Sequence, residues 1–134
     1  MSRFDRDRPA SGPLVQAFSD NGFRIDGIVY ATGVKLTPLT AQSWMAPSPL
    51  DLAAHDLDDL AKLDPAPEFV LLGTGATLRR PDPAVIAELQ ARGVGVEIMD
   101  SRAAARAWGL LRGEGRWIAA ARSEERRVGK ECRL

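Results

Sequence analysis

The second half of the chain alternates strand-like and helix-like segments, and this alternation limits the possible folds more than any other feature. Residues 68–72, 94–99 and 116–121 are short, largely apolar runs with the length of buried strands. The segments between them, 83–92 and 101–112, carry apolar residues at helical spacing. Strands separated by single helices indicate parallel pairing with right-handed crossovers. We therefore expect an α/β fold whose sheet has helices on both faces.

The first half of the chain is expected to be rich in strands. Apolar and polar residues alternate on both sides of Asp20-Asn21-Gly22, a cluster typical of turns. Pro38 marks the third strand as an edge strand or an interrupted one, because proline cannot donate a hydrogen bond to a sheet. The expected elements are strands at 14–18, 23–30 (large apolar groups on one face) and 34–44, and a short helix at 56–63. Both halves together predict a single domain with a central mixed, largely parallel sheet flanked by helices and a β-rich N-terminal part.

The two ends of the chain differ from this domain, which we expect to span 14–121. Residues 1–13 combine alternating charges, two prolines and a glycine with few apolar groups, so we expect a flexible arm. Residues 122–134 have no apolar face, and we expect them to be disordered. The run from Arg122 to Arg133 resembles read-through into foreign sequence. We interpret this tail as non-native and assign no function to its residues.

Length and composition restrict the class of protein. The chain has 134 residues, which fits one domain, and its net charge of zero argues against a nucleic-acid binder. The longest apolar runs, such as 69–72 and 117–121, are far shorter than the roughly 20 residues that cross a bilayer. The N-terminus lacks the apolar core of a secretory signal, and Cys132 has no second cysteine to pair with. We therefore expect a cytoplasmic protein without a transmembrane segment.

A candidate ligand or partner cleft follows two neighbouring strands of the expected sheet. One strand ends in a glycine loop and the next in a helix start, at the carboxyl edge where open parallel sheets bind ligands. Loop amides can hold an anion, and nearby arginines can supply a positive rim. The candidate residues are Gly73, Thr74, Gly75, Asp100, Ser101, Arg79 and Arg106. The alternative is structural: a tight turn, ordinary helix N-caps and scattered surface arginines.

Residue types with catalytic or metal-binding potential are few. His55 is the only histidine. The aspartates that follow it complement a helix dipole, and no second histidine or usable cysteine completes a transition-metal site. No serine lies in a G-x-S-x-G elbow, so nucleophilic catalysis is not indicated. We therefore expect no catalytic residues, no metal and no cofactor.

Three parts of the sequence carry a family resemblance. They are Gly-Thr-Gly at 73–75, Val-Glu-Ile-Met-Asp-Ser at 96–101 and the run at 23–30. With them, residues 14–121 resemble the Mth938-like family, formerly a domain of unknown function. The resemblance implies a compact α/β fold with a central mixed sheet, kinship with a mitochondrial assembly factor for respiratory complex I, and no agreed catalytic residues. Trp108-Gly109 departs from the Tyr-Asn of many relatives, so no detailed site carries over.

Two hypotheses for function follow, from different classes. The first is a non-enzymatic assembly or adaptor protein that binds a protein partner in a respiratory or other membrane complex. The second is a small-molecule or anion-binding domain, or an enzyme, that uses the loop at 73–75 and the helix start at 100–101. A concave pocket at this edge of the sheet favours the second hypothesis, whereas a plugged surface favours the first.

Overall fold

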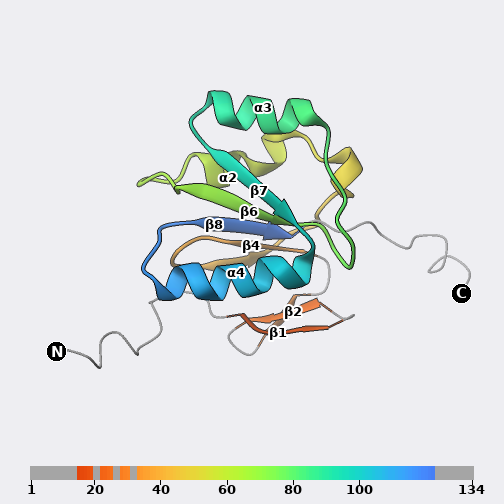
Figure 1. Ribbon diagram of the computed structural model, residues 1–134, viewed down its shortest axis with the longest axis vertical. Helices are drawn as coiled ribbons and strands as arrows, with labels where there is room; N and C mark the ends of the chain where they lie inside the picture. Colours follow the sequence, from red (N-terminus) through yellow and green to blue (C-terminus); the bar gives the residue numbers. More distant parts are fainter. Residues whose placement is uncertain (1–14, 20–21, 26–27, 31–32, 123–134) are drawn as a thin grey trace, which may run out of the picture.

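The computed structural model (Figure 1) describes residues 15–19, 22–25, 28–30 and 33–122 and forms two sheets. The strands are β1 (Val15–Ser19), β2 (Gly22–Ile25), β3 (Ile28–Tyr30), β4 (Val34–Leu36), β5 (Ala41–Ser43), β6 (Phe69–Gly73), β7 (Gly95–Met99) and β8 (Ala119–Arg122). The helices are the 3-10 helices η1 (Pro49–Asp51) and η2 (Ala54–Leu57) and the α-helices α2 (Asp58–Ala61), α3 (Pro83–Ala91) and α4 (Ser101–Gly113). One sheet has the order β1-β2-β3 and the other β5-β4-β8-β6-β7.

The five-stranded sheet is mixed. β6 pairs in parallel with β7 and β8, whereas β4 pairs antiparallel with β8 and β5. α4 lies against one face of this sheet, and α3 and α2 lie against the other (Figure 1). The three-stranded sheet is antiparallel throughout. The α/β fold with a central mixed sheet between helices is therefore confirmed.

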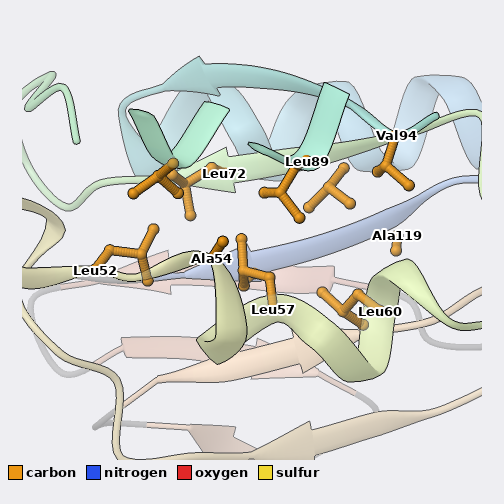
Figure 2. Close-up of a cluster of buried hydrophobic side chains, with 11 residues drawn as sticks. Leu52, Ala54, Leu57, Leu60, Leu72, Leu89, Val94 and Ala119 are labelled. Atoms are coloured by element: carbon orange, nitrogen blue, oxygen red, sulfur yellow. The ribbon is translucent and has the colours of Figure 1, made fainter. Parts of the chain in front are cut away.

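Each face of the mixed sheet has its own hydrophobic core. Because side chains alternate along a strand, Val70 and Leu72 of β6 belong to one core and Leu71 to the other. The first core also contains Leu89 of α3 and leucines of η2 and α2 (Figure 2). The second core contains Trp108 of α4. β6 contributes to both cores, as expected for a continuous apolar strand that is buried on both sides.

The strand expected at 23–30 is wrong, because this segment forms two strands. β2 and β3 pair antiparallel, with Ile25 opposite Ile28, so the chain reverses between them. Asp26-Gly27 stands between these residues, and this dipeptide is typical of two-residue hairpins. The expected common apolar face is also wrong, since Ile25 is buried and the Ile28 side chain is 58% exposed.

Two other elements in the first half of the chain have bounds that differ from the expected ones. β4 ends at Leu36 and β5 begins at Ala41, so the strand expected at 34–44 is interrupted, one of the two alternatives that Pro38 left open. The helix expected at 56–63 is divided between η2, which ends at Leu57, and α2, which ends at Ala61. Asp56 Oδ2 accepts a hydrogen bond from Ala53 N (2.9 Å), which fixes the start of the helical segment two residues earlier.

Arg122 belongs to the domain, whereas we expected it to be the first residue of the disordered tail. It ends β8, where its backbone lies between Val34 of β4 and Gly73 of β6, and its side chain is buried. Pairing with strands on both sides holds it in the sheet. Burial lowers the pKa of its guanidinium. Residues 1–13, expected to form an arm, and 123–134, the rest of the tail, lie outside the described residues.

An exposed ion pair joins the segments that precede β6 and β8. Arg116 Nη2 lies 2.7 Å from Glu68 Oε1, and Trp117 N donates to Glu68 Oε2 (3.3 Å). The hydrogen bond from Arg116 is the main reason that the pKa of the Glu68 carboxyl is lowered, and the Trp117 N–H adds to it. The two parallel strands therefore start from a common electrostatic contact.

The ion pair between Glu68 and Arg116 should be visible in the titration of the Glu68 carboxyl. We expect the Glu68 pKa in the folded protein to lie below its ordinary value of 4.5, and Arg116→Ala to raise it. Because the folded-state pKa is the lower one, the stabilisation is present above about pH 4.5 and is lost as pH falls through the folded-state pKa. NMR titration of the side-chain carboxyl measures both values. Equal pKa values in the two proteins would contradict this assignment.

Candidate functional site

The structure brings the glycine loop and the start of α4 into direct contact. β6 and β7 are parallel neighbours, so the segments that follow them meet at one edge of the sheet. Gly75 N donates to Ser101 Oγ (2.7 Å), and Ser101 N donates to Gly75 O (2.8 Å). Ser101 is fully buried. The two segments therefore lie in direct contact, as the sequence predicted.

The polar atoms of the loop are engaged within the protein. Thr74 N donates to Met99 O (3.0 Å). The Thr74 hydroxyl donates to Thr77 O (2.9 Å) and accepts from Arg79 N (3.0 Å). Together with the Gly75 N–H, these groups are the donors that an anion at the loop would need. Their partners are atoms of the loop itself, of the end of β7 and of the start of α4, so these groups are engaged within the protein.

Asp100 has the geometry of an N-cap. Its Oδ1 accepts a hydrogen bond from Ala103 N (2.8 Å), and its backbone is extended. The same arrangement begins α3, where Asp82 Oδ1 accepts from Ala84 N (2.9 Å). Such caps satisfy amides that have no partner in the first helical turn. Asp100 Oδ1 is thus bonded to the first turn of its own helix.

The two glycines of the loop have separate structural reasons. A Cβ at Gly73 would lie 3.1 Å from Ser101 Oγ and 3.2 Å from Ala104 Cβ, so glycine permits the close packing of β6 against α4. Gly75 has φ of 99°, a left-handed conformation that strongly favours glycine. Both glycines are therefore explained by packing and turn geometry.

The two candidate arginines lie at the surface. Arg79 joins the loop through its backbone N–H, and its side chain is exposed. Arg106 is exposed on α4, five residues beyond Ser101. The structure therefore unites Gly73, Thr74, Gly75 and Ser101 in one buried contact, while Arg79 and Arg106 contribute charge to the surface outside it.

Lys35 is a charged residue in a largely buried position that sequence reasoning missed. Its Nζ donates to Asp56 O (2.6 Å) and Asp59 Oδ1 (2.9 Å) and lies 4.3 Å from the centre of the Trp44 ring. Its side chain is only 11% exposed. The signal in the sequence is a lysine between two apolar strand residues. These contacts hold η2 and α2 to β4, so we assign Lys35 a structural role.

A small hollow lies between α4 and the sheet. Its lining is mainly apolar and comprises Val34, Leu36, Gly73, Ala104, Ala105, Trp108, Ala120, Ala121 and Arg122. Small side chains on both elements create the space. A lining of this kind offers neither a nucleophile nor a general base.

Metal and membrane features can be assessed for the part of the chain that the structure describes. Within it, no three His, Cys, Asp or Glu residues are grouped as a metal site requires. Among the same residues, no helix has both the length and the apolar character of a membrane span.

Comparison with known proteins places the chain in a family. Residues 15–122 match the family described as "Protein of unknown function (DUF498/DUF598)". The chain belongs to this family. A crystal structure from Bordetella parapertussis shares this family member's fold with a TM-score of 0.77 and 32% identity, covering 87% of this chain and 98% of that one. The solution structure of a Mth938-like domain from Bordetella pertussis gives 0.72 and 26%, covering 88% and 90%. The resemblance to the Mth938-like family is thereby confirmed.

A curated relative of this family member has a named role. "NADH dehydrogenase [ubiquinone] 1 alpha subcomplex assembly factor 3" of Danio rerio is 31% identical over 112 residues, which are 84% of this chain. The alignment covers 64% of the zebrafish protein. The chain therefore spans somewhat less than two thirds of the length of this relative.

The contact between the loop and α4 predicts a stability effect. Ser101→Ala removes the acceptor of the buried Gly75 N–H, and we expect a loss of about 1–3 kcal/mol in the free energy of unfolding. Urea denaturation measures this loss. Asp100→Asn keeps an N-capping side chain and serves as the control, with an expected change below about 0.5 kcal/mol. Unchanged stability of Ser101→Ala would refute the structural role.

Proposed function

We propose that this protein is a non-enzymatic assembly factor that binds a protein partner during assembly of a respiratory complex related to NADH dehydrogenase. The observation that carries the proposal is the similarity to the zebrafish assembly factor over 84% of this chain. Because that relative is longer, the proposal concerns the role of the shared domain. We further propose that the protein acts from the cytoplasm on a membrane-bound complex.

The geometry of the loop supports a binding role over catalysis. The polar groups of Thr74, Gly75 and Ser101 make hydrogen bonds to one another and to neighbouring backbone. A catalytic group must have a free proton or lone pair within reach of a substrate. A domain whose loop groups are bonded in this way can still present its outer surface to a partner.

Affinity purification tests the proposal. The full chain carries a tag, is expressed in the organism that makes it, and is recovered from membranes in mild detergent. We expect subunits of NADH dehydrogenase, or of its assembly intermediates, to be enriched over a purification with an unrelated tagged α/β domain. Recovery of no specific partner would count against an assembly role.

A second candidate function is binding of an anion or small molecule at residues 73–75 and 100–101. It is favoured by the convergence of these segments at the carboxyl edge of the sheet, with Arg79 and Arg106 at the surface nearby. A thermal-shift screen with phosphates, nucleotides and carboxylates tests it. Stabilisation that is lost in Arg79→Ala would support this function and would weaken the first. No stabilisation by any of these compounds would remove it.

A further inference from the structure

The solvent-exposed side of α4 has a composition that the fold itself does not require. The buried residues of the helix include Ala104 and Trp108, which pack toward the sheet. The exposed residues follow the spacing i, i+4, i+7, i+8, i+11 of a single helical stripe. They are Arg102, Arg106, Gly109, Leu110 and Gly113. We call this stripe the outer face of α4.

In the described structure, neither backbone conformation nor close packing requires the two glycines on the outer face. Glycine is the least favourable helix residue after proline. Neither Gly109 nor Gly113 is among the left-handed glycines, and a Cβ at either position would meet no atom within 4 Å. Neither a turn nor close packing therefore explains them. Their effect is a strip of bare helical backbone that is open to solvent.

Leu110 projects beside this strip. It is 66% exposed, more than most large apolar residues of a folded domain. A helix from another protein can approach bare backbone closely, as it does in membrane helix pairs where glycines recur every fourth residue. The apolar side chains of such a helix can then cover Gly109 and Gly113 and pack against Leu110.

The charge of the outer face indicates what kind of helix fits. α4 contains no acidic residue, and two of its three arginines, Arg102 and Arg106, lie on the same side as Leu110, whereas Arg112 is buried. An occupant with carboxylates opposite these arginines gains electrostatic complementarity. A lipid surface fits less well, because membrane-bound helices present a broad apolar face and the outer face has one large apolar residue.

We propose that the outer face of α4 docks an acidic amphipathic helix of the partner protein. This inference rests on the proposed assembly function and adds the surface and the chemistry of the partner. Apolar residues of the partner helix cover Gly109 and Gly113 beside Leu110. Its carboxylates face Arg102 and Arg106.

Site-specific photo-crosslinking tests the proposal. A benzophenone amino acid replaces Leu110 in the full tagged chain, the cells are irradiated, and the crosslinked peptides are identified by mass spectrometry. We expect an adduct with a helical segment in which Asp and Glu outnumber Lys and Arg. Adding Arg106→Glu should lower its yield about tenfold, since reversed charge opposes the carboxylates. Gly109→Leu, which covers the bare strip, should do the same, and Glu88→Ala on the exposed side of α3 should not.

The other outcomes overturn the proposal. They are an adduct with a second copy of this chain, an adduct with lipid, an adduct insensitive to Arg106→Glu, or no adduct. If NADH dehydrogenase subunits still copurify with the wild-type chain, only the surface assignment fails. If no partner copurifies, the assembly function fails as well.

Gly109→Ala separates this role from a structural one. We expect it to raise Tm by about 3 °C or more, because alanine is the better helix residue and meets open space. A lower Tm would show that the glycine serves the fold, which would also overturn the proposal.

Discussion

Val70→Asp is expected to abolish the cooperative unfolding transition of the domain. Val70 lies in β6, is 1% exposed and is flanked by Val96 in β7 and Ala119 in β8. Its side chain is part of the core between the sheet and α3. An aspartate at this position would bury a carboxylate among apolar groups, with an expected loss of about 4–5 kcal/mol or more. This loss is comparable to the whole stability of a small domain.

Circular dichroism during heating measures this effect, and the control is a charge on another strand. Gln42→Asp introduces the same carboxylate at an exposed position of β5 and should melt near the wild-type temperature. If Val70→Asp also melted cooperatively near that temperature, the assignment of β6 to the core would be refuted.

Trp108→Ala is expected to cost about 3–5 kcal/mol of unfolding free energy. Trp108 is the largest fully buried side chain, at 1% exposure, and it packs in the second core with Leu71 and Ile118. Removing it leaves a cavity between α4 and the sheet that the surrounding backbone cannot fill. Chemical denaturation by urea, monitored by circular dichroism, gives the change in free energy.

Leu110→Ala is the matched control for this substitution. It lies two residues further along the same helix and is 66% exposed. Both residue types favour helices, so we expect a change within about 0.5 kcal/mol. Similar losses for the two substitutions would contradict the orientation of α4.

The alternating strands and helices of the second half could be predicted, because the sequence features that specify them lie close together in the chain. Each strand is a short apolar run, and Asp82 and Asp100 are N-caps that the structure confirms through hydrogen bonds to Ala84 and Ala103. Such features depend on residues a few positions apart. The division of 23–30 into two strands was missed, because the alternating pattern continues across a dipeptide that also favours a turn.

The position of the candidate site could be predicted from the sequence. Whether its polar groups are open to a ligand could not. Parallel strands bring their carboxyl ends to one edge, so the meeting of Gly75 and Ser101 followed from the topology. Whether their amides and hydroxyls remain open to a ligand depends on distances below 3 Å between segments 26 residues apart. The burial of Arg122 likewise depends on strands that pair across the sheet. No local pattern in the sequence contains these relationships.

The level of assembled NADH dehydrogenase in cells that lack this protein shows whether the protein acts in the assembly of that complex. Native gels of solubilised membranes, stained for NADH oxidation, measure the intact complex. We expect a reduced level that is restored by the wild-type chain and by Asp100→Asn, which keeps the cap but not the carboxylate. A normal level of intact complex in the deletion strain would contradict the assembly function.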